Sequence, residues 1–161
     1  MASSSSSFDP VEKTDSATPS ASQAALLQQI ADIEHDGDSH PREAAQALER
    51  LLPATAPFSR ERLELLTVRG LMLTFASEPE AADKVAQMFD NWVGTPHANA
   101  AAAAAALVRA RARSLSGNLR QADALVSEAL ARLPADSPPL TRLRYLFTQV
   151  RVKDDGGRLE D

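Results

Sequence analysis

The sequence predicts an all-α protein in which helical hairpins stack in series, and two observations carry this prediction. Its 161 residues include 30 Ala and 20 Leu but only ten Val and Ile together. This composition favours helices, because strands draw on β-branched and aromatic side chains. From residue 20 onward, apolar runs alternate with clusters of Pro, Gly and Asp, as expected for a chain of short helices.

Residues 1–19 are Ser, Thr, Pro and acidic residues with almost no apolar side chains. Such a segment buries too little surface to offset the entropy of ordering, so we expect a disordered tail followed by one helical domain at 20–161. Pro41, Pro79 and Pro138 fall where a first helical turn tolerates proline. The expected helices cover 21–35, 41–52, 58–75, 79–92, 97–115, 118–133 and 138–153.

Residue types recur along the helical part at an offset of 40 residues. Three mostly apolar columns are spaced i, i+3 and i+7, which places them on one face of the first helix of each hairpin. A fourth column of small residues follows these helices. The columns are Leu63, Ala103 and Leu143, with polar Gln23 as the exception; Leu26, Leu66, Ala106 and Leu146; Ile30, Gly70, Ala110 and Val150; and Gly37, Ser77, Gly117 and Gly157.

Burial explains why such hairpins would stack. One hairpin of about 35 residues covers too little of its own apolar surface to be stable alone, so its neighbours must complete the core. Small residues in the shared columns let helix axes approach closely. Burying Leu66 or Leu146 in such a seam is expected to contribute roughly 1.5–3 kcal/mol each. The concave side is expected to stay free for a ligand.

The stretch Gly117–Ala122, continuing to Ala129, Leu130 and Pro134, resembles the second half of a tetratricopeptide repeat. The 40-residue period is similar to the longer tetratricopeptide-like units of maltose-operon-activator-type regulators and of some bacterial cyclic-dinucleotide synthases. The resemblance implies a right-handed solenoid of about 3.5 repeats. It also implies a bacterial signalling protein in which this region precedes a diguanylate cyclase or transcription-regulator domain. The family's first-helix signature is missing, with Ala106, Arg109 and Ala110 in its place.

The fourth unit is incomplete, because Gly157–Asp161 begins a second helix that stops after one turn. We therefore expect this unit to expose its apolar seam, including Leu143, Leu146 and Val150, with no capping repeat. Either a longer chain or a homo-oligomer is expected to cover this end.

Three arginines are the candidate partner-binding residues. Arg111 recurs as Arg151 at the 40-residue offset, and Arg144 lies two turns before Arg151. In the tetratricopeptide register all three approach the inner helix face, where guanidinium groups could hold a carboxylate or a phosphate through paired hydrogen bonds. The alternative is a solvated basic face whose charges pair within each helix.

A second candidate site lies at 32–43, where acids occupy positions 1, 3, 5 and 7, Gly occupies position 6 and Glu occupies position 12. The pattern resembles an EF-hand calcium loop, in which oxygen ligands surround the ion. Its ligands would be Asp32, Glu34, Asp36 and Glu43. The alternative is an acidic turn between two helices.

Several classes of function are not favoured. The chain has no cysteine, which excludes thiol nucleophiles and Cys-based zinc sites. It contains neither a phosphate-binding glycine loop nor a nucleophile elbow, so we predict no catalysis and no cofactor. Its longest apolar run is far shorter than the roughly 18 residues of a membrane span, and no secretory signal is present, so we expect a cytoplasmic protein. Residues 100–161 are basic but poor in aromatic side chains, so a nucleic-acid partner is not expected.

These features together predict a protein–protein interaction or sensory module. A preformed concave surface would bind an extended or helical segment of another protein, or another domain of the same chain. The alternative function is a calcium-responsive binding protein that uses the loop at 32–43.

Overall fold

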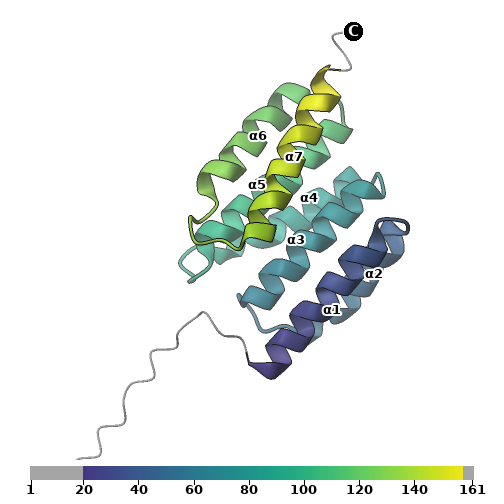
Figure 1. Cartoon of the computed structure of the whole chain (residues 1–161). Helices are drawn as coiled ribbons and strands as arrows, with labels where there is room; N and C mark the ends of the chain where they lie inside the picture. The colour runs from purple at the N-terminus through teal and green to yellow at the C-terminus, as the bar shows by residue number, and fades with distance from the viewer. Residues whose placement is uncertain (1–19, 158–161) are drawn as a thin grey trace, which may run out of the picture.

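The structure, a computed structural model, describes residues 20–157 (Figure 1). The predicted disordered tail at 1–19 and residues 158–161 lie outside this range. The second helix predicted to begin at Gly157 does not begin there, because Gly157 is the last residue of the preceding helix. Within residues 20–157 the chain forms seven α-helices and two 3-10 segments, with no strand, which confirms the all-α prediction. The elements are α1 (Ala21–Gly37), α2 (Pro41–Leu51), η1 (Leu52–Ala54), α3 (Arg60–Phe75), α4 (Pro79–Gln87), η2 (Met88–Trp92), α5 (Ala98–Leu115), α6 (Leu119–Arg132) and α7 (Pro139–Gly157).

Local side chains explain several helix starts. The hydroxyl of Ser20 accepts a hydrogen bond from the Gln23 N–H, and the Gln23 side chain accepts one from the Ser20 N–H, which forms a capping box. Pro41 and Pro79 occupy the first turns of α2 and α4, as predicted. The predicted end of the last helix at 153 is too early, because α7 continues to Gly157.

The α3–α4 and α5–α6 turns have the same geometry and lie 40 residues apart. Ser77 and Gly117 adopt left-handed backbone conformations, with φ of 59° and 81°. In both turns the following residue donates its N–H to a carbonyl five residues earlier, at 2.9 Å. These features define a Schellman motif. The predicted column of small residues therefore marks equivalent turns in these two hairpins, whereas Gly37 is the last residue of α1.

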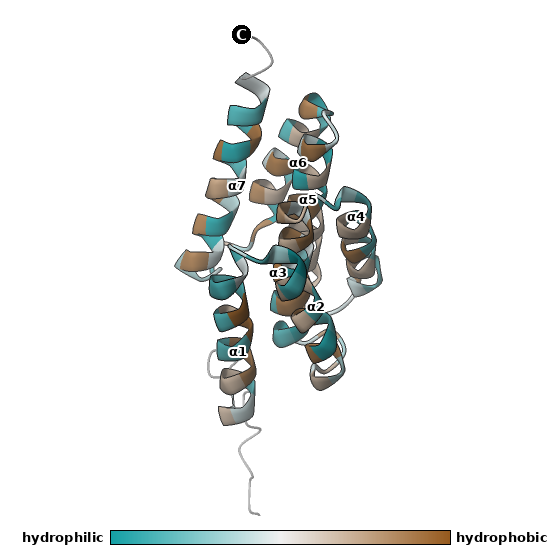
Figure 2. Ribbon diagram, turned by 90° about the vertical axis from the view of Figure 1, so that its right-hand side faces the viewer, coloured by the Kyte–Doolittle hydropathy of each residue, from teal (hydrophilic) through white to brown (hydrophobic). Residues whose placement is uncertain are grey.

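The helices contact one another in two ordered sets. Each helix packs against the next in the chain, and α1, α3, α5 and α7 also contact one another in that order. Figure 2 shows α1 and α7 together on one side of the molecule and α4 on the other. No helix of residues 20–157 is long and apolar enough to cross a membrane.

The centre of the core lies between α3 and α5. A Cβ atom built on Gly70 would lie 2.7 Å from a methyl carbon of Val108, so only glycine permits this approach of the two helices. In the adjacent column Leu66 is 1% exposed and Ala106 is 4% exposed. The core therefore combines small residues at close approaches with leucine where there is more space.

The same column is not buried in α7, where Leu146 is 44% exposed. The expected 1.5–3 kcal/mol from burying Leu146 is therefore wrong, since among the described elements no helix covers that face. The predicted exposure of the last unit is confirmed, with Leu143 at 48% and Val150 at 56%. The opposite face of α7, which includes Tyr145 and Val152, is buried.

Candidate functional site

A cavity of about 450 Å³ is lined by side chains from α1, α3, α5 and α7. Its polar lining includes arginines from α5 and α7, and its apolar lining comes mainly from α3 and α7. Leu140 and Phe147 of α7 are 79% and 63% exposed, and with Leu143 they give the cavity a group of accessible apolar side chains. The cavity therefore places positive charge beside accessible apolar surface.

The three arginines predicted as partner-binding residues all line this one cavity. Arg111 is 5% exposed, and the Arg144 side chain is 16% exposed. Arg151 is exposed. The alternative of a solvated face with pairing inside each helix does not describe Arg111 or Arg144, because both are largely buried and pair with carboxylates on other helices.

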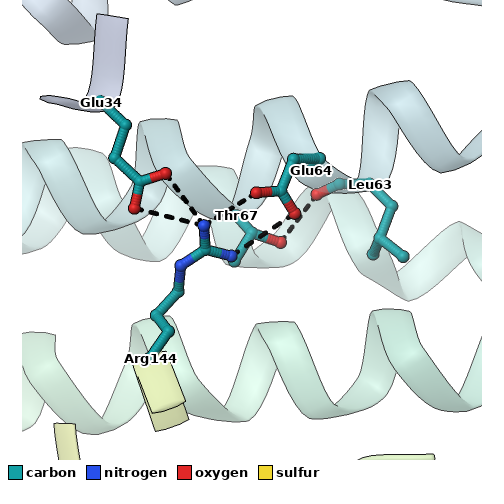
Figure 3. Close-up of polar contacts among 5 residues, drawn as sticks. All are labelled: Glu34, Leu63, Glu64, Thr67 and Arg144. Atoms are coloured by element: carbon teal, nitrogen blue, oxygen red, sulfur yellow. Dashed lines mark hydrogen bonds and ion pairs between the residues drawn. The ribbon is translucent and has the colours of Figure 1, made fainter. Parts of the chain in front are cut away.

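Arg144 links three helices across the cavity (Figure 3). Its Nη2 donates to Glu34 of α1 at 2.9 Å and to Glu64 of α3 at 2.8 Å, and its Nη1 donates to Glu64 at 3.4 Å. Burial alone would lower the pKa of Arg144, but the charges and hydrogen bonds of Glu64 and Glu34 outweigh burial and raise it. Arg144 therefore remains charged and holds α7 against α1 and α3.

Arg111 has a weaker set of partners. Its Nη1 donates to Oδ2 of Asp155 at 3.2 Å, and the hydroxyl of Ser114 donates to the same oxygen at 2.5 Å. The buried Nε of Arg111 has no acceptor among the described residues. Burial, followed by the charge of Arg151, lowers the pKa of Arg111, and Asp155 only partly opposes this.

Arg151 is held by an aromatic ring. Its guanidinium carbon lies 5.4 Å from the centroid of Phe75, a cation–π contact between α7 and α3. Within residues 20–157, Arg151 has no carboxylate within 4.0 Å. Its charge is thus available to a ligand in the cavity.

The carboxylate partners were not predicted from the sequence, and Glu34 was assigned to a calcium loop. The sequence separation of the paired residues does, however, indicate two of these ion pairs. Glu64 and Arg144 are 80 residues apart, which is twice the 40-residue offset of the sequence. Arg111 and Asp155 are 44 residues apart, which is this offset plus about one helical turn. Both pairs therefore join opposite charges at a spacing that the sequence itself shows.

The calcium loop predicted at 32–43 does not form. Asp32, Glu34 and Asp36 lie within α1, and Glu43 lies in the first turn of α2. Successive side chains of a helix point about 100° apart, so these carboxylates do not surround one ion as EF-hand ligands do. Across residues 20–157, no three or more His, Cys, Asp or Glu side chains form a group that could hold a metal ion.

A second, smaller cavity of about 300 Å³ lies among η2, α5 and α6. Its Arg109 pairs with Asp90 at 3.3 Å, and its Arg132 pairs with Glu128 at 3.1 Å. The larger cavity is the stronger candidate, because it retains unpaired positive charge.

Compared with protein-family models, curated proteins and solved structures, the chain shows no significant match.

Proposed function

We propose that this chain is an interaction module that binds a segment of another protein, or of a further domain of its own chain, in the cavity between α1, α3, α5 and α7. The cavity itself is the observation that supports this proposal. It presents exposed leucine and phenylalanine side chains beside arginines, and exposed apolar patches rimmed by polar groups are typical of protein-binding surfaces. An amphipathic helix or an extended segment would fit such a groove.

In this proposal the helices form a right-handed, tetratricopeptide-like solenoid of about 3.5 repeats. The equivalent turns at Ser77 and Gly117 and the ordered contacts among α1, α3, α5 and α7 support this arrangement. The module would act by recognition rather than catalysis and would use no cofactor. We place it in a bacterial signalling protein of the cytoplasm, as a sensory or regulatory region ahead of an output domain.

A peptide selection tests the proposal. A phage-displayed library of helix-forming peptides is selected on the wild-type protein and on a variant with Leu143→Ser and Phe147→Ser. Both residues are exposed, at 48% and 63%, so the variant should keep its core. The control bait is Val93→Ser, because Val93 is 86% exposed and lies outside this cavity.

We expect related peptides to be enriched on the wild-type and Val93→Ser baits and lost on the double variant. Peptides with acidic residues next to apolar ones should dominate, since the cavity offers arginines for the acidic residues and apolar side chains for the others. The proposal is wrong if no family of peptides is enriched on the wild-type protein, or if the double variant enriches the same peptides equally well.

A further inference from the structure

The part of the cavity formed by α5 and α7 contains more positive than negative charge. Arg111 and Arg151 both line it, and Asp155 is the one carboxylate within 4.0 Å of either guanidinium among the described residues. The Asp155 oxygen that faces Arg111 also accepts a hydrogen bond from Ser114. Among the described residues, Arg111 therefore has one carboxylate partner, which also binds a hydroxyl, and Arg151 has none within 4.0 Å.

The other half of the cavity has the opposite balance. Arg144 is paired with both Glu34 and Glu64, at 2.9 and 2.8 Å. Asp38, directly after α1, also lines the cavity, so negative charge is in excess near α1 and α3. An anion entering the cavity would be repelled by this excess and attracted by Arg111 and Arg151. The charge distribution therefore points to one end of the cavity as the anion-binding end.

Burial makes the unbalanced charge near Arg111 costly. Arg111 is 5% exposed, and its Nε lacks an acceptor within residues 20–157. A buried charge is stable only when nearby groups compensate it, and here the neighbouring Arg151 has the same sign. A bound anion would supply the missing negative charge.

The surroundings of these arginines are apolar. Phe75 lies under Arg151 at 5.4 Å, and Leu140 and Phe147 on α7 are 79% and 63% exposed. A cavity of about 450 Å³ falls within the range of about 300–1,000 Å³ that is typical of small-molecule sites. Such a lining favours a ligand that has an apolar chain as well as a charge.

We infer that the cavity binds a small amphiphilic organic anion, with its carboxylate or phosphate between Arg111 and Arg151 and its apolar chain against Phe75, Leu140 and Phe147. This inference goes beyond the proposed protein binding and does not require it. Where both occur, the ligand and the protein segment compete for the same cavity, and the ligand regulates the interaction.

Isothermal titration calorimetry with the full chain tests the ligand chemistry. Octanoate and octyl phosphate are the two probes, used below their micelle concentrations, and they distinguish a carboxylate from a phosphate headgroup. Octylammonium and octanol lack the anion, whereas acetate and inorganic phosphate lack the chain. We expect saturable binding of at least one probe and affinities at least about tenfold weaker for all four controls. No binding of either probe, or equal binding of octanol, would overturn the inference.

Arg151→Gln tests the position of the headgroup. Arg151 is exposed, so this variant should fold, unlike a change at buried Arg111. Lys153→Gln is the matched control, because Lys153 is an exposed cation on the same helix that does not line the cavity. We expect Arg151→Gln to weaken probe binding at least about tenfold and Lys153→Gln to change it by less than about twofold. Equal effects of the two variants would contradict the assignment.

The two proposals can fail separately. Peptide selection on the wild-type protein requires no small ligand, and the titration requires no peptide. Octanoate or octyl phosphate binding without peptide enrichment would leave only the ligand site. Peptide enrichment without binding of either probe would leave only the protein-binding site.

Discussion

The middle hairpins and the last helix contain the same residue column but bury it very differently. Leu66 of α3 is 1% exposed, whereas Leu146, two periods later in α7, is 44% exposed. α3 contacts α1 and α2 on one side and α4 and α5 on the other, whereas α7 packs chiefly against α5 and α6. The comparison shows that burial in a stacked array depends on having neighbours on both sides, and that a residue pattern alone does not determine it.

Truncating Leu66 and Leu146 to alanine should give the largest difference in stability between these two regions. Leu66→Ala should lower the free energy of unfolding by about 2–5 kcal/mol, because it leaves a cavity in a closely packed core. Leu146→Ala should change it by less than about 0.5 kcal/mol, since the side chain is already half exposed. Urea denaturation followed by far-ultraviolet circular dichroism measures both. Equal losses of unfolding free energy in the two variants would show that Leu146 of α7 is buried in solution.

Overpacking should reveal how close the middle helices are. Gly70→Ala places a Cβ atom 2.7 Å from Val108, so we expect a net loss of about 1–2 kcal/mol despite the better helix propensity of alanine. Adding Val108→Ala should reduce that clash. Denaturation of the wild type, both single variants and the double variant measures this coupling. Additive single effects would show that the two positions do not touch.

The ion pairs of Arg144 connect the two compared regions. Arg144→Met leaves Glu34 and Glu64 facing each other without a cation, and we expect a loss of about 1–2 kcal/mol for this partly buried group. The loss should shrink as salt is added, because salt screens the repulsion between the carboxylates. Arg142→Met is the control, since Arg142 is exposed on the same helix and should cost less than about 0.5 kcal/mol. A salt-independent loss would argue against the electrostatic origin.

Tyr145 reports whether the inner face of α7 is truly buried. Burial raises the pKa of its phenol well above the usual value, and it is the chain's only tyrosine, so phenolate absorbance reports this site alone. Ionisation is then favoured in the unfolded state, so Tyr145 has no effect on stability below about pH 9 and lowers it by about 1.4 kcal/mol at pH 11. Tyr145→Phe should remove this part of the loss of stability at alkaline pH. Phenolate absorbance from the folded protein near pH 10 would contradict the burial.

The smallest expected changes in stability come from variants that test whether the α3–α4 and α5–α6 turns are equivalent. Ser77→Gly should stabilise the protein by about 0.5–1 kcal/mol, because glycine adopts a positive φ without steric strain. Gly117→Ser should destabilise it by a similar amount for the same reason. Thermal unfolding of both variants provides the measurement. Changes of the same sign would mean that the turns are not equivalent.

The fold could be predicted largely from local signals. Proline at first turns, small residues at turns and the spacing of apolar side chains are properties of neighbouring residues. Helices form in all seven predicted places, but the one predicted at 79–92 is an α-helix only to Gln87 and a 3-10 segment from Met88 to Trp92. The extent of α7 was underestimated, since Asp155 in its last turn is bound by Arg111 and Ser114 of α5. The spacing of residues within one helix does not predict such a contact between two helices.

The candidate site could be predicted only in part. The 40-residue offset predicts Arg111 and Arg151, the two-turn spacing from Arg151 predicts Arg144, and all three line one cavity. Glu34 was instead interpreted as a calcium ligand, because its local pattern fits a loop equally well. Its actual partner is Arg144, 110 residues away, and this pairing depends on how α1 and α7 approach each other across α3. A local sequence pattern does not predict a contact between helices so far apart in the chain.

The separation of Glu34 and Arg144 also bears on how the protein is made. A ribosome that adds about 5–20 residues per second needs roughly 5–20 s to extend the chain over the 110 residues between them. The amino-terminal hairpins can form early from contacts between neighbouring segments, but throughout this interval Glu34 lacks the cation that will bind it. This ion pair therefore forms only after the preceding helices and Arg144 of α7 have been synthesised.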